Sequence, residues 1–426
     1  MRKMDYQNVK GTQDYLPEAE VIRRKIRRTL EDTFIQYGCK PLETPILNYT
    51  ELMASKYGGG AEILEEMYTL IDRGERDLAL RYDLTIPFAK VIAMNQTIKM
   101  PFKRYEIGKV FRDGPIKTGR FREFTQCDVD IVGVDSQIAE AELMEMALSA
   151  FAKLDLKIAI QYNNRKLLSG MLEMFEVPSE QMSAVILVLD KLEKVGVEAV
   201  KKELSELGLS LTVVESIERF LTDDENSSIY YFEPFTKANE NIEQGVKELK
   251  KLMSFLAYLK ISEQCVFNPF LARGLEIYTG TIYELFLVDQ TIKSSIGSGG
   301  RYDNAIAGLL GTDQSFSTVG ISFGLDVIYT ALALKDPAAL EPSLIDFYII
   351  PMNTLKESLL VATEFRQRGY NVELDMSNKK LGKALERANK DGIRNVIVVG
   401  ENEVKSNQIT VKNMETGETS IELFQF

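Results

Sequence analysis

The stretch that decides the fold is Arg120–Asp130, with the sequence RFREFTQCDVD. Polar and apolar side chains alternate along much of it, as they do in a β-strand with two different faces. Residues 102–112 alternate in the same way, and the loop Asp113–Gly119 (DGPIKTG) between the two segments is rich in turn residues. The sequence therefore predicts an antiparallel hairpin.

One face of the second predicted strand carries groups of three chemical kinds. Its even-numbered residues are Arg120, Arg122, Phe124, Gln126, Asp128 and Asp130, and Arg112 ends the first strand. Guanidinium groups bind phosphate through parallel hydrogen bonds. The ring can stack on a base, and the amide and carboxylate groups can bind an ammonium ion. The face suits a ligand with phosphates and an adenine at one end and an amino acid at the other. A solvated polar face of an antiparallel sheet is the alternative interpretation.

The composition limits the chemistry that the chain can perform. The 426 residues include no histidine, no tryptophan and 3 widely spaced cysteines. Without imidazole there can be no Ser-His-Asp triad, no Cys-His pair and no histidine-ligated metal. The cysteine spacing gives neither a disulfide framework nor a zinc site. Catalysis must come from carboxylates, guanidinium groups, amines, phenols, backbone dipoles or divalent ions held by oxygen.

The net charge of −12 argues against a general positive field for nucleic acid. An RNA partner would have to be bound by local basic patches, such as Lys379, Lys383, Arg387 and Lys390, which recur at helical spacing. No run approaches the roughly 20 apolar residues that cross a bilayer, and the N-terminus lacks the apolar core of a signal peptide. We therefore expect a cytoplasmic protein without a membrane partner.

Periodic patterns divide the chain into domains. Helices are expected at 19–36 and 138–154, an extended segment at 41–47, a strand leading into a helix at 76–93, strands at 271–287, a tight turn at Gly297–Asp303 (GSGGRYD), and a strand leading into a helix at Gly320–Leu334. The predicted domains are a first domain in two parts (1–165 and 256–334), a helical insertion (166–255), a linker (335–343) and a C-terminal α/β domain (344–426).

Two further segments carry candidate binding groups. Arg81–Thr85 (RYDLT) places Asp83 and Thr85 on one face, where they could hold an ammonium group. A carboxylate and a hydroxyl before a helix also form a helix N-cap. Leu271–Gly280 (LARGLEIYTG) places Arg273 before a glycine that lets a ligand approach the backbone, although an ordinary strand is the alternative.

The glycine pair before Arg301 leaves room for a ligand backbone or a phosphate, but it is also typical of a turn. This segment lacks the GxGxxG and GxxxxGK[ST] spacings. The sequence therefore supports neither a Rossmann dinucleotide site nor a Walker P-loop.

Several segments, in this order, resemble the histidyl-tRNA synthetases, a family of class II aminoacyl-tRNA synthetases. They are KGTQDYLP (10–17), PLETPIL (41–47) as motif 1, LRYDLT (80–85), FR with TGRFREFTQCDVDIVG (111–133) as motif 2, LARGLEIYTG (271–280) as the histidine-specific signature, GSGGRYD (297–303) and STVGISFGLD (317–326) as motif 3. The resemblance spans nearly the whole chain. It implies an α+β fold with a class II antiparallel sheet flanked by helices, a helical insertion and a C-terminal α/β anticodon-binding domain.

The same resemblance implies the activity and its partners. The family activates histidine with ATP, releases pyrophosphate with Mg²⁺, and transfers the amino acid to the 3′ end of its tRNA. The two-part first domain would then be catalytic. Since motif 1 builds the subunit interface in class II enzymes, a homodimer is implied as well.

The matching positions imply roles for individual residues. Histidine would be bound by Asp83, Leu84, Thr85, Gln126, Asp130, Ile277 and Tyr278, with Asp83, Thr85 and Gln126 at its α-amino group and Asp130 and Tyr278 at its imidazole. ATP would be bound by Arg112, Arg120, Arg122, Phe124 and Arg273, with Phe124 stacked on adenine and Arg120 and Arg122 along the ATP tail. Arg112 and Arg273 would grip the α-phosphate and act in catalysis. No metal-ligating residue is identified.

Two departures from the family pattern keep an alternative open. Motif 3 normally ends in Glu-Arg, where this chain has Asp326-Val327, and the Asp-Tyr of the histidine signature is Glu276-Ile277. Losing one charge-assisted contact costs about 1.5–3 kcal/mol. The alternative is a paralogue of the ATP phosphoribosyltransferase regulatory-subunit type, which binds histidine without charging tRNA. It typically lacks the C-terminal domain that this chain has. A class II synthetase for another amino acid is disfavoured by LARGLEIYTG and by Asp130.

The missing histidines suggest a further hypothesis. A histidine-charging enzyme is needed most when histidine is scarce, and ribosomes would then stall at its own histidine codons. A chain without histidine can still be made, which would suit a second, inducible copy. The missing tryptophan shows that a rare residue can also be absent without such a reason.

Overall fold

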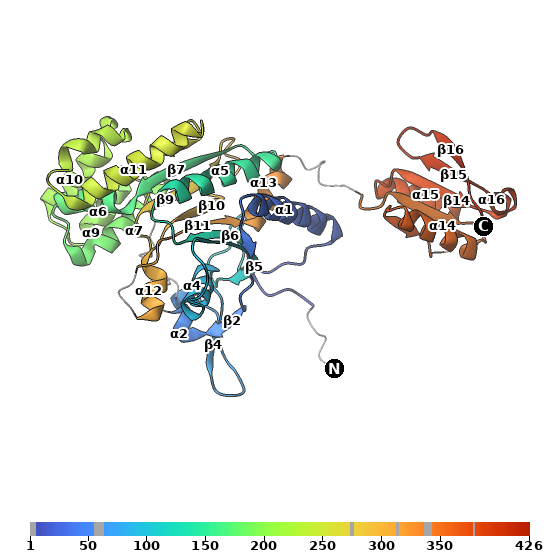
Figure 1. Ribbon diagram of the computed structural model, residues 1–426, viewed down its shortest axis with the longest axis horizontal. Coiled ribbons are helices and arrows are strands. Elements are labelled where there is room, and N and C mark those ends of the chain that lie inside the picture. The colour runs from blue at the N-terminus through green and yellow to red at the C-terminus, as the bar shows by residue number, and fades with distance from the viewer. Residues whose placement is uncertain (1–5, 55–63, 273–276, 312–314, 336–342, 378–379) are drawn as a thin grey trace. The chain divides into compact units, whose positions relative to one another are not determined.

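The computed structural model describes residues 6–54, 64–272, 277–311, 315–335, 343–377 and 380–426. The chain divides into two compact units, one of residues 1–14 and 23–335 and the other of residues 15–22 and 336–426 (Figure 1). The boundaries predicted for the catalytic parts, the insertion and the linker stay predictions.

The first unit is built on an eight-stranded sheet with the order β1-β5-β6-β11-β10-β9-β7-β8. Its strands are β1 (Lys40–Pro41), β5 (Phe102–Phe111), β6 (Glu123–Val132), β7 (Ile158–Asn164), β8 (Cys265–Phe267), β9 (Thr281–Leu287), β10 (Gly297–Arg301) and β11 (Thr318–Gly324). The inner strands pair antiparallel, and only the edge strands β1 and β8 pair in parallel with their neighbours. The predicted hairpin is confirmed as β5 and β6.

The prediction of a tight turn at Gly297–Asp303 is wrong. Gly297–Arg301 forms β10, in the interior of the sheet between β9 and β11. Its glycines are required because neighbouring strands approach closely, so that a Cβ atom on Gly299 would overlap the carbonyl oxygen of Gly320. Arg301 is buried and forms two hydrogen bonds of 2.8 Å with the carboxylate of Glu140. Its guanidinium therefore links β10 to α5 (Ile138–Lys153), the helix that carries Glu140.

Two helices cover one face of the sheet. Phe323 of β11 packs against Phe34 of α1 (Pro17–Gln36), with ring centroids 6.1 Å apart, and against Phe151 of α5 (Ile138–Lys153), at 5.4 Å. Figure 1 shows α1 and α5 along the same side of the strands. The helices predicted at 19–36 and 138–154 are confirmed, and α13 (Leu325–Lys335) directly follows β11 as predicted.

A small sheet and three helices lie on the other side of the eight-stranded sheet. The sheet has the order β2-β4-β3, with β2 (Leu47–Tyr49), β3 (Thr69–Ile71) and β4 (Asp77–Leu80). The helices are α2 (Thr50–Met53), α4 (Thr85–Met94) and α12 (Asn304–Leu310). Phe88 of α4 stacks on Phe102 of β5, with ring centroids 6.5 Å apart. The first half of β5 is therefore covered, while the face over β6, β11 and β10 stays partly open.

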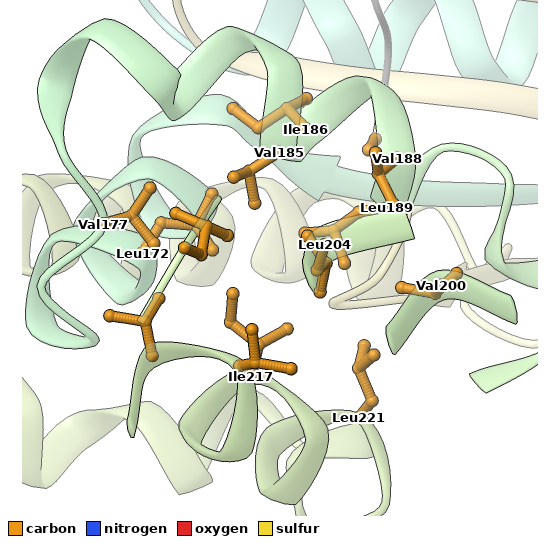
Figure 2. Packing of buried hydrophobic residues seen from close by; sticks show 14 of the residues in the cluster. Leu172, Val177, Val185, Ile186, Val188, Leu189, Val200, Leu204, Ile217 and Leu221 are labelled. Atoms are coloured by element: carbon orange, nitrogen blue, oxygen red, sulfur yellow. The ribbon is translucent and has the colours of Figure 1, made fainter. Parts of the chain in front are cut away.

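A block of short helices follows β7. It contains α6 (Arg165–Met174), α7 (Met182–Leu189), α8 (Leu192–Val195), α9 (Val197–Glu206), α10 (Leu211–Leu221) and α11 (Glu240–Tyr258), with 3₁₀ helices at Ser179–Gln181, Asp224–Ser227 and Ile229–Phe235. Figure 2 shows that Leu172, Val185, Leu204 and Ile217 from four of these helices meet in one apolar core. A core of its own is what an inserted domain requires.

The second unit contains a five-stranded sheet with the order β13-β12-β14-β15-β16. The parallel strands are β13 (Val372–Leu374), β12 (Phe347–Pro351) and β14 (Asn395–Val399), and β15 (Gln408–Asn413) and β16 (Thr419–Leu423) continue the sheet antiparallel. Its helices are α14 (Leu355–Gln367), α15 (Leu381–Lys390) and α16 (Glu401–Ser406). The predicted α+β fold class, with its antiparallel sheet, helical block and C-terminal α/β domain, is confirmed. None of the described helices has the length and apolar character needed to span a bilayer.

Candidate active site

The open face over the central strands carries the candidate site. Partly exposed side chains, among them Phe124 and Gln126 on β6, Ser322 on β11 and Ser298 on β10, alternate with buried ones. Cross-strand pairing places them on one side of the sheet. Since α1 and α5 cover the opposite side, a ligand would contact the sheet here. From Phe124 to Asp130 the strand extends by about 20 Å, enough for a nucleotide and an amino acid end to end.

Two of the six even-numbered residues predicted for this face lie outside the strand. β6 begins at Glu123, so Arg120 and Arg122 belong to the hairpin loop. Arg122 forms an ion pair of 2.7 Å with Asp113, and its aliphatic part packs so closely on Gly11 that a side chain there would collide. Arg120 is exposed. The prediction that all six lie along one strand is wrong for these two arginines, because the regular register of β5 and β6 ends at Phe111 and Glu123, and the backbone N–H of Arg122 donates to the carbonyl oxygen of Gly11 instead.

Asp130 lies at the buried end of the face and is paired with Arg104. The two residues are cross-strand partners, and Nη2 of Arg104 lies 2.6 Å from Oδ2 of Asp130. Tyr302 donates its hydroxyl hydrogen to the same carboxylate. Gly320 leaves the space for it, because a Cβ atom there would overlap Oδ1 of Asp130. Burial raises the pKa of Asp130, and the charge of Arg104 opposes that shift.

Arg104 also fixes the segment that precedes α4. Its Nη2 donates to the carbonyl oxygen of Leu84 at 3.1 Å, and its guanidinium lies over the ring of Phe88, 4.3 Å from the centroid. Sequence reasoning assigned no role to Arg104. The signal was its place directly opposite Asp130 in the predicted hairpin, since a buried acid on one strand needs a cation close to it.

Asp83 lies one residue before Leu84, the N-cap residue of α4, and its side chain caps the first turn of the helix from there. Its Oδ1 accepts the backbone N–H of Ile86 at 2.9 Å. Burial raises the pKa of Asp83, while this hydrogen bond and the nearby Arg112 lower it. Thr85 is partly exposed and begins the helix. The cap does not exclude ligand binding, because a carboxylate can accept several hydrogen bonds.

Arg81, from the same predicted cluster, has a structural position. Its Nη1 lies 2.8 Å from Oε1 of the buried Glu106 and donates to the carbonyl oxygen of Thr44 at 2.7 Å. Its Nε donates to the carbonyl oxygen of Lys109 at 2.8 Å. The arginine therefore links the motif 1 segment to β5.

Arg112 lies between two aromatic rings at the other end of the face. The centre of its guanidinium is 4.2 Å from the ring centroid of Tyr82 and 5.2 Å from that of Phe124. Its Nε donates to the carbonyl oxygen of Tyr82 at 3.1 Å. These two cation–π contacts hold the guanidinium in place beside the partly exposed ring of Phe124.

Gln126, Ser322 and Asp128 lie next to one another in the centre of the face. Nε2 of Gln126 donates to Oγ of Ser322 at 2.9 Å. Ser322 is the cross-strand partner of Asp128. Burial raises the pKa of Asp128 to about 7. Sequence reasoning placed Asp128 on this face and gave it no role, because its cross-strand neighbour Ser322 lies nearly two hundred residues away in the sequence.

Ile277 and Tyr278 pack beside α4 and α12. They contact an apolar cluster that includes Phe88, Tyr302 and Ile306. The ring of Tyr278 lies over Gly300, where an added Cβ atom would come within 2.8 Å of it. Both residues therefore border the buried end of the face. Arg273 and Glu276 lie outside the described residues, so the role of Arg273 stays a prediction.

The Asp326-Val327 pair of motif 3 is buried behind the hairpin loop. Asp326 forms an ion pair with Arg23 and accepts the backbone N–H of Thr125 at 2.7 Å. Val327 packs against Gly119, where an added Cβ atom would lie 3.2 Å from it. Valine therefore acts as a packing residue at this position.

No metal centre is found within the parts of the chain that the structure describes. No group of three or more acidic or cysteine side chains there could hold an ion. The three cysteines are buried, and burial raises the pKa of Cys39 to about 12 and that of Cys265 to about 12.

Comparisons with known proteins show which family the sequence resembles. The family model described as histidyl-tRNA synthetase matches residues 11–328, and one described as anticodon binding domain matches residues 346–424. A protein of Shouchella clausii named histidine–tRNA ligase 2 is 60% identical over 98% of each chain. Histidine–tRNA ligase 1 of Bacillus anthracis is 56% identical over 97% of each chain.

Solved structures agree. The crystal structure of histidyl-tRNA synthetase from Nostoc sp. PCC 7120 superposes with a TM-score of 0.84 at 28% identity, covering 99% of this chain and 97% of that one. A structure described as ATP phosphoribosyltransferase regulatory subunit/histidyl-tRNA synthetase from Bacillus halodurans C has a TM-score of 0.75 at 19% identity, which indicates a shared fold alone. By its family match and its identity to curated relatives, the chain belongs to the histidyl-tRNA synthetase family.

Proposed function

We propose that this chain is a histidine–tRNA ligase, which activates L-histidine with ATP and transfers it to the 3′ end of its tRNA. The observation that carries the proposal is the order of groups on one open face. Arg112 and Phe124 lie at one end, and Gln126 and Asp130 follow along the same strand. A nucleotide and an amino acid bound end to end need this order.

The buried end of the face suits histidine. Asp83, Thr85 and Gln126 offer oxygen acceptors for the α-ammonium group. Asp130 can accept a ring N–H from the imidazole, and its ion pair with Arg104 favours the ionised carboxylate that this requires. Leu84, Ile277 and Tyr278 would line the pocket.

The other end suits ATP. Phe124 would stack on the adenine, and Arg112, held between two rings, would bind the α-phosphate. Arg120 and Arg122 in the hairpin loop would lie along the triphosphate, and Arg273 would give a second cation at the α-phosphate. The ion pair with Asp113 leaves Arg122 a weaker candidate than the exposed Arg120.

This arrangement needs no imidazole base. The histidine carboxylate attacks the α-phosphorus and pyrophosphate leaves, which gives a mixed anhydride with AMP. The terminal ribose hydroxyl of tRNA then attacks the carbonyl carbon, and AMP leaves. The first nucleophile is already anionic, so positioning and neutralisation of phosphate charge by Arg112 and Arg273 supply the catalysis.

Mg²⁺ would enter as part of the ATP substrate, bound to its phosphates. The described residues form no acidic cluster that would hold the ion by itself, so no residue is assigned to it. We also propose a cytoplasmic homodimer with subunit contacts through the motif 1 segment, which sedimentation of the purified protein would test.

The second unit would bind the anticodon of tRNA. Lys383 and Lys390 are exposed on α15, while Arg387 pairs with Glu373 at 2.6 Å. The exposure of Lys383 and Lys390 supports phosphate contacts by these two lysines, while the ion pair holds Arg387 within the unit. Lys379 lies outside the described residues.

Histidine-dependent exchange between ATP and pyrophosphate, followed by charging of a histidine tRNA transcript, tests the proposal. Both activities are expected. Exchange without charging would indicate an adenylate-forming paralogue, and binding of histidine without either activity would indicate a regulatory subunit.

A further inference from the structure

Glu66 connects the segment before α4 with the loop of the β5–β6 hairpin. Its Oε2 accepts the hydroxyl hydrogen of Tyr82 at 3.0 Å, and its backbone carbonyl oxygen accepts the N–H of Asp113 at 2.8 Å. Its carboxylate also packs on Gly114, where an added Cβ atom would overlap Oε1. Glu66 therefore contacts Tyr82 and the two residues that directly follow Arg112.

Tyr82 contacts Arg112 with both its side chain and its backbone. The centre of the guanidinium lies 4.2 Å from the ring centroid, and Nε of Arg112 donates to the carbonyl oxygen of Tyr82 at 3.1 Å. The tyrosine is buried, with 8% of its surface exposed. A phenol that donates a hydrogen bond to a carboxylate gains electron density in its ring, which strengthens the attraction of the ring for a cation. The bond to Glu66 thus acts on the contact with Arg112.

These contacts hold Arg112 without neutralising its charge. The buried guanidinium groups of Arg104 and Arg301 each face a carboxylate, at 2.6 Å and 2.8 Å. Arg112 contacts two rings and a carbonyl oxygen, and no ion pair of this residue is found among the residues that the structure describes. A guanidinium with a carboxylate partner would have to exchange it for a phosphate, whereas Arg112 keeps its charge for a ligand. This difference favours a role in ligand binding over a purely structural one.

We propose that Glu66 and Tyr82 are positioning residues for Arg112: the carboxylate fixes the tyrosine ring against the start of the hairpin loop, and the ring orients the guanidinium toward the α-phosphate of ATP. The inference rests on the proposed function, in which Arg112 binds that phosphate. Both residues act through Arg112 and need not touch the nucleotide.

The test compares four full-length variants with the wild type: Tyr82→Leu, Tyr82→Phe, Glu66→Ala and Glu66→Gln. Leucine removes a cation–π contact, so the kcat of histidine-dependent pyrophosphate exchange should fall roughly threefold to thirtyfold, with an unchanged KM for histidine. Tyr82→Phe and Glu66→Ala both break the bond between the two residues and keep the ring, so each should lower kcat by about threefold. Glutamine still accepts the hydroxyl hydrogen, so Glu66→Gln should stay within about twofold of the wild type.

Binding of ATP and of adenosine separates the positioning of Arg112 from general damage to the site. Adenosine has no phosphate, so its dissociation constant, measured by calorimetry, should change by less than about twofold in every variant. The dissociation constant for ATP should rise least in Glu66→Gln and most in Tyr82→Leu. An equal loss of affinity for both ligands, or an unchanged kcat in Tyr82→Leu, would overturn the inference.

The double variant Tyr82→Phe/Glu66→Ala decides whether the two residues act through one bond. Because either change breaks that bond, the double variant should keep the kcat of the single variants, and losses that multiply would overturn the link. Tyr105→Phe is the matched control. Tyr105 is also a buried tyrosine that donates to a glutamate, Glu31 at 2.8 Å, but it packs against Phe34 on the face that α1 covers. Its loss should leave kcat unchanged.

The two proposals can fail separately. Wild-type protein that binds ATP but gives no exchange would overturn the proposed function, and the comparison of ATP with adenosine would still decide the roles of Glu66 and Tyr82. Wild-type protein that does not bind ATP would overturn both. Thermal unfolding shows which variants keep the fold, and Tyr82→Phe and Glu66→Ala keep the test decisive if Tyr82→Leu unfolds.

Discussion

Arg104 and Asp130 face each other across β5 and β6 as a buried ion pair, with Nη2 and Oδ2 2.6 Å apart. Both side chains are almost without solvent contact, at 0% and 5% exposure. The pair holds the acid at the buried end of the site and, through the carbonyl of Leu84, the segment before α4.

Replacing Arg104 with methionine should destabilise the fold and weaken histidine binding together. The change leaves Asp130 buried without its cation, which costs about 3–5 kcal/mol. Urea denaturation measures the free energy of unfolding, and calorimetry measures affinity. Adding Asp130→Asn should recover part of the lost stability and none of the affinity. Full stability in the single variant would contradict the role given to the pair.

Histidine affinity should fall as the pH falls through about 7, because Asp128 then gains a proton. Burial and the nearby Asp130 raise the pKa of Asp128 to about 7, and Arg104 opposes them. The charged or titratable groups around Asp128 are Asp83, Arg104, Glu106, Asp130 and Tyr302. Protonation removes a negative charge from the face, which weakens the attraction for the α-ammonium group of histidine. Calorimetry between pH 8 and pH 6 should show a steeper loss for wild type than for Asp128→Asn. The imidazole of the ligand titrates equally in both, so identical slopes would refute the prediction.

The same residue should make stability depend on pH. The pKa of Asp128 in the fold lies above its ordinary value of 3.8, so the fold disfavours the ionised form. Its contribution to stability is present at low pH and is lost as the pH rises toward about 7. Asp128→Asn cannot titrate, so its advantage in free energy of unfolding should grow from pH 5 to pH 8, by roughly 1–3 kcal/mol. Urea denaturation at both values measures this, and an advantage that shrinks with pH would be inconsistent with a raised pKa.

Arg120 should matter more for ATP than Arg122. It is exposed in the hairpin loop, while Val327 fills the position at which the family usually has an arginine. Arg120→Ala should raise the KM for ATP about tenfold or more, as expected for one charge-assisted contact, and leave stability unchanged. Arg122→Ala should lower the melting temperature, because it loses an ion pair and the packing on Gly11. If both variants raised the KM for ATP equally and neither lowered the melting temperature, the different roles given to the two arginines would be refuted.

The absence of histidine should favour synthesis of this chain when histidine is scarce. Genes for the natural sequence, with no histidine codon, and for a variant with several exposed residues changed to histidine can be expressed side by side. Under histidine limitation the variant should accumulate to a lower level, because ribosomes stall at its added codons. A second variant with the same positions changed to glutamine controls for the substitutions themselves. Equal accumulation of all three would end the hypothesis.

Local sequence patterns were sufficient for the hairpin, the flanking helices and the residue types along β6. They were insufficient wherever a long-range neighbour decides the outcome. Gly297–Arg301 has the composition of a turn, yet it is a strand because the close approach of β11 leaves no room for side chains. In the sequence, Arg301 has the pattern of a ligand-binding arginine. In the structure it pairs with Glu140, which is far away in the sequence.

The arrangement of residues along β6 was predicted in part. The alternation along β6 placed Phe124, Gln126 and Asp130 on one face, which the structure confirms. Alternation could not show where the strand ends, so Arg120 and Arg122 were included as well. It also could not show partners on other strands, and so missed Arg104 and Ser322, whose roles arise from cross-strand pairing.

The bare backbone at Gly320 has an evolutionary consequence. Asp130 keeps its place only while position 320 has no side chain, since even a methyl group there would overlap its carboxylate. Whether a mutation at position 130 or 320 is tolerated therefore depends on the residue at the other position, although the two are far apart in the gene. Relatives that enlarge position 320 must withdraw or shorten the acid at 130. Because we propose that Asp130 binds the imidazole of histidine, we expect such relatives to bind histidine more weakly.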